Sequence, residues 1–265
     1  HKPHQIRLHT QNRSNDTGIC FECGDGSDGV YAPAVNADLP GGNYQFSSVN
    51  IPAGVIITVT GSEPLNIQCT GAVIIDGIIR ANGGEGGNGI TFVTFGVGGT
   101  GVAGGNNGGN GVYSNSLGPL NGFPGTGMGG GQEGAGWSGG GGGGHLNNGS
   151  NSGGVGGSGG ISYGDPLAVE LLGGSGGGGG SGGYSCGAGG GGAGGGIIVI
   201  TSCLSVTIGS TGSIECKGGN GGSDGTGNCG AGGGGSGGSI RLNSTVIINN
   251  GSLNVDGGTG GQSTV

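Results

Sequence analysis

The chain is poor in charge, in aromatic side chains and in long apolar runs. Only 8% of its residues are charged and 4% are aromatic, and 6 Lys and Arg stand against 14 Asp and Glu, for a net charge of −8. So few basic side chains exclude a surface for nucleic acid or for anionic lipid, because both are bound through Lys and Arg. No apolar run approaches the ~18 residues that span a bilayer. We therefore expect neither a nucleic-acid partner nor a membrane span.

Proline is also scarce, with 8 residues, whereas glycine supplies 84 of the 265. Collagen needs glycine at every third position, but here residues 139–144 and 176–180 are unbroken glycine, so a collagen helix is excluded. Intrinsic disorder is disfavoured as well, since disordered chains are usually highly charged. The aliphatic residues are instead concentrated in short blocks. This pattern indicates ordered strands joined by glycine-rich segments.

Strand-like blocks fill residues 43–82. Short runs rich in Val, Ile and Thr recur about every ten residues, each bounded by Gly or Pro. Within one run, Leu65, Ile67 and Cys69 alternate with polar residues, which is the period of a strand with one face buried. From residue 83 onward glycine dominates.

Internal repeats give the strongest signal. Residues 186–197 match residues 229–240 at an offset of 43, and residues 212–222 match residues 251–261 at an offset of 39. A third copy of the second motif begins at Gly77. The alignment places Ile79, Ile214 and Leu253 at one equivalent position, and Ala81, Cys216 and Val255 at another, which we expect to face inward. Repeats of this size with strand patterning are typical of stacked β architectures.

The glycine tracts admit two interpretations. They could be flexible linkers. Alternatively, they form extended helices with three residues per turn, which lie side by side because glycine has no side chain to keep the backbones apart. The recurrence of Cys-Gly-Ala plus a glycine run before two separate strands favours ordered packing. We predict an all-β fold with essentially no long α-helix: a β-solenoid of stacked rungs with polyglycine-II-like segments. Residues 1–42 are expected to form a polar N-terminal arm, and residues 43–265 the repeat domain.

Seven cysteines in a chain with few core-forming residues favour disulfides and an oxidising, extracellular compartment. Cys186 and Cys229 occupy equivalent repeat positions, so they are the preferred pair. Cys20 and Cys23 form a lone CxxC motif, which lacks the second pair needed for zinc and the βαβ context of a redox site. They are expected to form disulfides, with each other or with distant cysteines. The sequence starts at His1 without a signal peptide, which suggests a mature secreted chain.

No combination of residues predicts catalysis, a cofactor or a metal. His1 with His4 or His9 could form a copper brace, but an exposed polar arm is the simpler interpretation. The Asp25 to Asp28 loop and residues 218–224 are rich in Gly and Asp, yet neither keeps the spacing of a calcium repeat, so both are interpreted as polar turns. We expect a protein that is not an enzyme.

Three stretches carry a resemblance to known proteins. Residues 44–61, the Tyr163-Gly-Asp-Pro segment and the glycine run at 173–180 resemble a family of secreted bacterial glycine-rich repeat proteins, and this likeness covers residues 43–261. It implies a secreted protein of β-repeat architecture. The glycine tracts are also similar in composition to phage tail-fibre tip adhesins with sandwiched polyglycine helices.

Taken together, the sequence favours a subunit of an extracellular filament or surface layer that self-associates into a homopolymer. The segment Gln5, Ile6, Arg7, Leu8, His9, Thr10 is the candidate assembly strand, which would add to a neighbouring subunit. A receptor-binding adhesin that recognises a cell surface or a glycan is the alternative. An ice-binding protein is the third hypothesis, and it is disfavoured by the irregular spacing of Thr and Gly.

Overall fold

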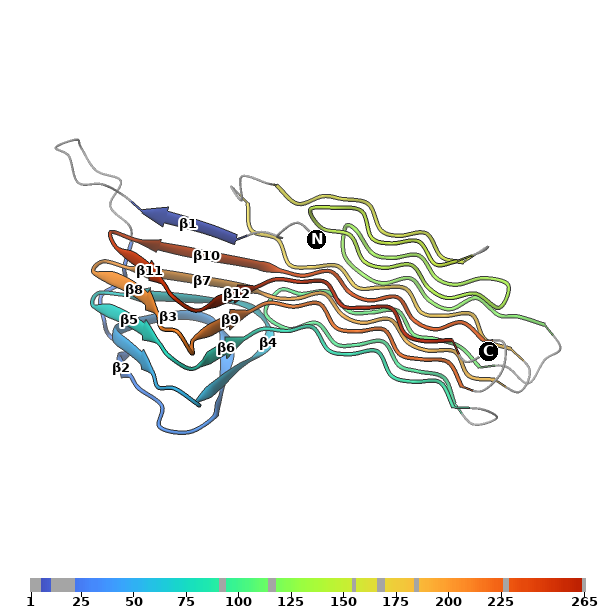
Figure 1. Ribbon diagram of the computed structural model, residues 1–265, viewed down its shortest axis with the longest axis horizontal. Coiled ribbons are helices and arrows are strands. Elements are labelled where there is room, and N and C mark those ends of the chain that lie inside the picture. The colour runs from blue at the N-terminus through green and yellow to red at the C-terminus, as the bar shows by residue number, and fades with distance from the viewer. Residues whose placement is uncertain are drawn as a thin grey trace.

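Parallel strands and extended glycine-rich segments make up the protein, which is seen here in a computed structural model (Figure 1). The described residues are the backbone of 6–10 and then 22–90, 94–113, 118–153, 156–165, 170–183, 186–225 and 229–263. They contain no helix, so the predicted all-β class is confirmed. None of them forms a helix that could cross a membrane.

The strands divide the chain into two strand-rich parts separated by the long glycine-rich stretch. In chain order they are β1 (Ile6–Thr10), β2 (Gly29–Tyr31), β3 (Ala37–Ile51), β4 (Ile56–Cys69), β5 (Ala72–Ile75), β6 (Ile78–Arg80), β7 (Ile197–Ser202), β8 (Ser205–Ile208), β9 (Ser213–Glu215), β10 (Ser239–Ser244), β11 (Ile247–Asn249) and β12 (Ser252–Asn254). Strand β3 runs through the boundary expected between residues 42 and 43. It pairs with β4 on both sides of that boundary, with a shift of register between Pro40 and Gly42.

All strands join one sheet, every pairing in it is parallel, and the sheet does not close on itself. The pairings form three columns. The first runs from β4 through β7 and β10 to β1, the second from β3 through β5 and β8 to β11, and the third from β4 through β6 and β9 to β12. The long strands β3 and β4 each bend to contribute to more than one column.

The core consists of aliphatic ladders in which each residue packs beside its equivalent in the next strand of the column. Ile214 pairs with Ile79 on one side and with Leu253 on the other, as the repeat alignment predicts. Ile79 and Ile214 are buried. Ala81, Cys216 and Val255 are buried too, in agreement with the expected inward position. Burial of such ladders stabilises the fold by about 25 cal/mol per Å2 of apolar surface.

One detail of the repeat alignment is wrong by a single residue. The alignment matches Ile240 with Ile197, whereas the sheet pairs Ile240 with Ile198. Ile198 and Ile240 are both fully buried, and a slip by one residue would turn one of them to the opposite face. The buried faces therefore determine the register.

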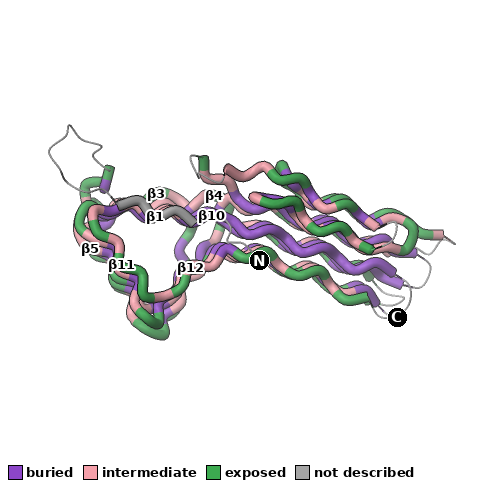
Figure 2. The backbone as a smooth tube through the Cα atoms, turned by 45° about the horizontal axis from the view of Figure 1, so that its top comes forward, coloured by how far each residue is buried: buried purple, intermediate pink, exposed green. Residues whose placement is uncertain are grey.

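Beyond the sheet, the glycine-rich part forms extended segments that run side by side away from the strands (Figure 1). We call this part the glycine bundle. Its segments are residues 81–90, 94–103, 104–113, 118–126, 129–135, 138–145, 147–153, 156–165, 171–183, 186–196, 216–225, 229–238 and 255–263. Figure 2 shows that the inner segments are buried along their length and that the outer ones are partly exposed.

Segment 186–196 shows how the bundle is held together. Its backbone amides donate in three sets, with members spaced three residues apart: Ala188, Gly191 and Gly194; Gly189, Gly192 and Gly195; Gly190, Ala193 and Gly196. The first set donates to segment 104–113, the second to 229–238 and the third to 81–90. Three residues per turn is the period of a polyproline-II-type helix, which makes no internal hydrogen bonds and must find partners in its neighbours.

The carbonyl groups of segment 186–196 are used in the same way. They accept hydrogen bonds from segments 94–103, 171–183 and 216–225. Glycine is required at this density: a Cβ at Gly192 would overlap the carbonyl oxygen of Gly219 on the neighbouring segment. The glycine tracts are therefore packed in an ordered way and are not flexible linkers.

Candidate assembly surfaces

Strand β1 lies at one edge of the sheet, beside β10. The two pair in parallel from Ile6 opposite Ile240 to Thr10 opposite Ser244. Five of the six residues of the candidate assembly strand are thus in a strand that pairs with the chain's own sheet, although they precede β10 by more than 200 residues. Gln5 lies outside the described residues.

The remaining terminal strands also have one paired side each. Among the described residues, β11 pairs only with β8 and β12 only with β9, while at the other end of the columns β2 pairs only with β3. Apolar side chains accompany these edges: Val30 is 67% exposed at the β2 end and Ile248 is 45% exposed on β11. Unpaired strand edges are templates for the addition of further strands.

The first disulfide ties the polar N-terminal part to the sheet. Cys23 bonds to Cys203, which follows β7, and their Cα atoms are 5.6 Å apart across a sequence separation of 180 residues. Of the two options left open for the CxxC motif, Cys23 thus takes a distant partner. Cys20 lies outside the described residues.

The second disulfide joins Cys186 to Cys229, the pair that the repeat alignment favoured. The two cysteines begin segments 186–196 and 229–238, which lie side by side and lead into β7 and β10. The bridge thus crosslinks neighbouring segments of the glycine bundle at the ends that lie away from the sheet.

Two further cysteines, Cys69 and Cys216, are buried thiols. Burial raises the pKa of both thiols, most strongly that of Cys216, which is completely enclosed. A thiol with a raised pKa is a weak nucleophile, so both cysteines act as small core side chains.

A polar network crosses the glycine bundle at Tyr163. The Tyr163 hydroxyl donates to the carbonyl of Gly173 and accepts from the Ser175 hydroxyl at 3.0 Å, and the Ser175 amide donates to the Ser236 hydroxyl at 2.8 Å. The His145 ring lies 5.0 Å from the Tyr163 ring. Burial raises the pKa of Tyr163, which keeps the phenol neutral. The network links three segments of the bundle.

The loop from Asp25 to Asp28 is held by hydrogen bonds to its two carboxylates. The Asp25 carboxylate accepts from the Ser27 amide, and the Asp28 carboxylate accepts from the Gln45 amide. Hydrogen bonds from Ser27 lower the pKa of Asp25. Within the described residues, no three His, Cys, Asp or Glu side chains come together as a potential metal site. The four histidines include His1, His4 and His9, which lie outside the residues whose side chains are described.

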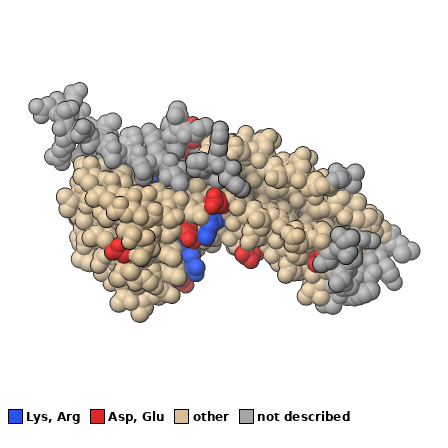
Figure 3. Space-filling model, in the orientation of Figure 1, with Lys and Arg blue, Asp and Glu red and all other residues tan. Residues whose placement is uncertain are grey.

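Charged side chains are few, and the basic ones lie beside acidic ones. On the face drawn in Figure 3, Lys and Arg lie beside acidic side chains where the sheet meets the glycine bundle. Lys217 forms an ion pair with Glu215 at 3.1 Å, and Arg80 donates to the Thr58 hydroxyl. Local pairing leaves no broad basic surface among the described residues, in keeping with the acidic composition.

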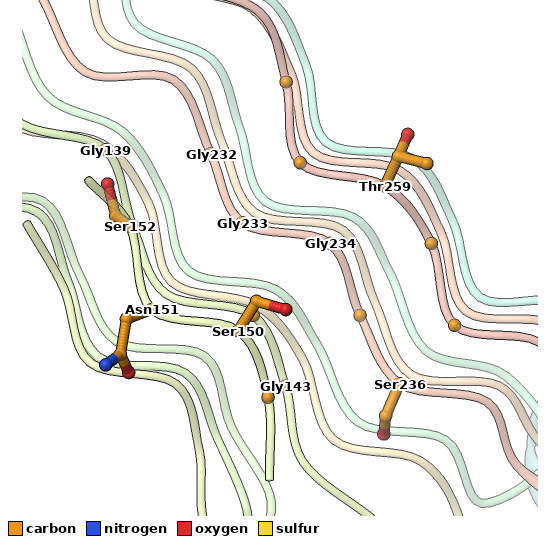
Figure 4. Close-up of a pocket in the computed structure, with 18 of the residues that line it drawn as sticks. Gly139, Gly143, Ser150, Asn151, Ser152, Gly232, Gly233, Gly234, Ser236 and Thr259 are labelled. Carbon is orange, nitrogen blue, oxygen red and sulfur yellow. The ribbon is translucent and has the colours of Figure 1, made fainter. Parts of the chain in front are cut away.

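A groove of about 960 Å3 runs along the glycine bundle. Its floor is residues 231–236 of segment 229–238, and its walls come from residues 139–140, 142–143, 147–153 and 256–261. Figure 4 shows Gly232, Gly233 and Gly234 on one of these segments and Ser150 and Thr259 on others. Sequence reasoning missed this groove, because it arises from the lateral order of the segments, which no local pattern encodes.

Comparisons with protein-family models, with curated proteins and with solved structures all find no match. The function therefore has to be argued from the geometry of the strand edges and the glycine bundle.

Proposed function

We propose that this protein is a non-enzymatic structural subunit of an extracellular filament or surface assembly, whose copies join by addition of β-strands at the ends of the parallel sheet. The observation that carries the proposal is the placement of β1. A strand from the far N-terminus pairs in parallel with β10 at a sheet edge. Such pairing depends little on side chains, so the same strand fits an equivalent edge on another copy.

In this proposal the three columns are the faces of an open β-solenoid and the strands are its stacked rungs. The terminal strands β1, β11 and β12 at one end, and β2 at the other, then present unpaired backbone to the next subunit. Parallel rungs can continue from one copy to the next without a change of direction. Exposed edges of this kind are normally protected in monomeric proteins, and here Val30 and Ile248 add apolar surface to them.

Two features support an extracellular setting. The disulfides Cys23–Cys203 and Cys186–Cys229 form and persist in oxidising compartments. The bundle offers little apolar surface per residue, so covalent links across it are a natural supplement to its stability. Both features fit a protein that works outside the cell.

Electron microscopy of the purified protein tests this proposal. We expect the full chain to form filaments or sheets at high concentration, and a chain lacking residues 1–12 to remain monomeric. A synthetic peptide of residues 1–12 should bind the shortened chain, because it restores the strand beside β10. The matched control is the same peptide with Leu8→Pro, since proline in the middle of a strand removes a backbone donor.

Either of two results would contradict the proposal. One is a full chain that stays strictly monomeric at high concentration. The other is assembly that proceeds unchanged when residues 1–12 are absent.

A receptor-binding adhesin is the second candidate, supported by exposed apolar side chains on the glycine bundle. Val97 and Phe123 are 61% and 57% exposed, on segments that both hydrogen-bond to segment 104–113, and Met128 is 62% exposed. Exposed apolar clusters are typical of binding surfaces. Binding of the isolated monomer to cells or to glycans, abolished by Phe123→Ser, would favour this candidate over the filament subunit.

A further inference from the structure

The groove along segment 229–238 has the form of one unfilled position in the glycine bundle. Segment 186–196 is fully enclosed. Three neighbouring segments accept hydrogen bonds from its amides, and three others donate hydrogen bonds to its carbonyls. Segment 229–238 is bonded to 171–183, 186–196 and 216–225, and it accepts from 138–145 and 255–263. The place between the last two is the groove.

Residues of segment 229–238 whose amides lack a partner line this place. Gly230, Gly233 and Ser236 donate to segment 171–183, and Gly232, Gly235 and Gly238 donate to segment 216–225. The third set, the amides of Ala231, Gly234 and Gly237, donates to no described residue, and Ala231 and Gly234 line the groove. The segment is buried throughout, and Ala231 is only 6% exposed. Buried amides without partners are rare in folded proteins, so a regular row of them indicates a missing partner.

The groove wall offers matching acceptors. On segment 138–145, the carbonyls of Gly139, Gly141 and Gly142 accept hydrogen bonds, whereas those of Gly140 and Gly143 accept none from the described residues. Gly140 and Gly143 are again three residues apart, and both line the groove. An occupant with three residues per turn would meet donors on the floor and acceptors on the wall in the same register.

The walls also show why the occupant must be rich in glycine. The groove is lined largely by glycine backbone, and its lining residues include no Phe, Tyr or Trp, the side chains on which sugar rings and other flat ligands stack. Inside the bundle, equivalent positions are filled by backbones so close that a Cβ at Gly192 overlaps its neighbour. An occupant held at the same spacing needs glycine on its inward faces, whereas its outward face can carry Ser, Asn or Thr.

The groove lies on segments that continue directly from the terminal strands or lead into their neighbours. Its floor leads directly into β10, and its wall segment 255–263 follows directly from β12. A copy that stacks on β1, β11 and β12 therefore meets the groove as a continuation of the same surface.

We propose that this groove binds one extended glycine-rich segment from a second copy of the chain, which accepts hydrogen bonds from the amides of Ala231 and Gly234. The inference deepens the proposed function and rests on it for the source of the segment. The binding site itself stands on the free amides and carbonyls of the groove.

Binding to the full chain is measured first, under conditions in which it is monomeric. The probe is a fluorescent peptide with the sequence of residues 173–183, Gly-Gly-Ser-Gly-Gly-Gly-Gly-Gly-Ser-Gly-Gly. The control peptide has valine in place of every third residue. Fluorescence anisotropy should show binding of the first peptide and none of the second, since valine cannot enter a position that requires bare backbone.

The blocking variant is Gly260→Leu. A Cβ at Gly260 meets no atom nearer than 3.7 Å, so leucine can be accommodated there and projects into the groove. The matched control is Thr100→Leu, which places the same side chain on an exposed residue that does not line the groove. We expect Gly260→Leu to weaken peptide binding about tenfold or more, and Thr100→Leu to change it by less than about twofold. Gly257→Leu provides a second blocking variant, and unchanged thermal unfolding verifies that each variant folds.

The source of the segment is then tested in assembled material. A photo-crosslinking residue replaces Thr259 on the groove wall, and isotopically labelled and unlabelled copies are mixed before assembly. We expect crosslinks between different copies, ending on a glycine-rich segment of the second copy. Crosslinks confined to single copies would overturn the assignment to a second copy.

The outcomes separate this inference from the proposed function. If the protein forms filaments but the peptide does not bind, or binds Gly260→Leu equally well, the groove proposal fails and the filament proposal survives. If the peptide binds and Gly260→Leu abolishes binding, but no filaments form, the site stands and the filament proposal fails. Competition by an oligosaccharide instead of by glycine-rich peptides would overturn the peptide site.

Discussion

Cys186 and Cys229 face each other across two neighbouring segments of the glycine bundle, with their Cα atoms 6.0 Å apart. Each cysteine begins a segment that ends in a strand, β7 after the first and β10 after the second. The disulfide and the strand pairing therefore hold the same two segments at opposite ends. Between these ends, the segments are joined by backbone hydrogen bonds every third residue.

Removal of this disulfide is expected to lower stability without a change of fold. In the chain-entropy estimate, opening a loop of 43 residues costs about 4 kcal/mol of unfolding free energy. The double variant Cys186→Ser with Cys229→Ser should show this loss in urea unfolding under non-reducing conditions. A loss below about 1 kcal/mol would mean that hydrogen bonding alone fixes the two segments.

Close packing of glycine predicts a strong contrast between two glycine-to-alanine substitutions. Gly192→Ala places a methyl group onto the carbonyl oxygen of Gly219 and should cost about 2 kcal/mol or more. Gly260→Ala has free space and should be neutral or stabilise by up to about 1 kcal/mol, because alanine restricts the unfolded chain. Thermal unfolding of both variants checks the contrast, and equal effects would contradict the packing described.

Buried thiols should be protected from alkylation in the folded protein. Burial raises the pKa of Cys69 and of Cys216, and neither thiol is accessible. Iodoacetamide followed by peptide mapping should leave both cysteines unmodified in the native state at pH 8 and should label both after denaturation. Rapid native labelling of Cys216 would show that the core opens easily.

Acid should weaken the contact between Glu215 and its partners. Burial acts to raise the pKa of Glu215, but hydrogen bonds from Asn82 and Lys217 outweigh it, so the pKa is lowered. The charged carboxylate therefore stabilises the fold at pH above the ordinary value of 4.5, and this contribution is lost as the pH falls through the lowered pKa. Glu215→Gln should reduce the acid dependence of stability below pH 4.5 by up to about 1 kcal/mol.

Much of the strand arrangement could be predicted because the buried ladders repeat in the sequence. The equivalence of Ile79, Ile214 and Leu253 is a register in the sheet, and the matched cysteines 186 and 229 are joined in the structure. Each of these positions is determined by its own inward-facing side chain, which is information that a local pattern carries.

The lateral order of the glycine segments could not be predicted. A residue such as Gly234 differs from Gly233 only in the neighbour that it faces, and both sit in one unbroken glycine run. Glycine carries no side chain that would distinguish an inner from an outer position. The groove, and the free amides on its floor, therefore emerge only from the packing of distant segments.

Amide hydrogen exchange, resolved residue by residue by NMR, tests the glycine bundle and its unfilled position most directly. Amides of segment 186–196 should exchange slowly, as should that of Gly233, which donates to Gly178. In the monomer, Gly234 should exchange about a hundredfold faster than Gly233, and this difference should disappear when copies assemble. Fast exchange throughout segment 186–196, or equal exchange of Gly233 and Gly234 in the monomer, would contradict the account.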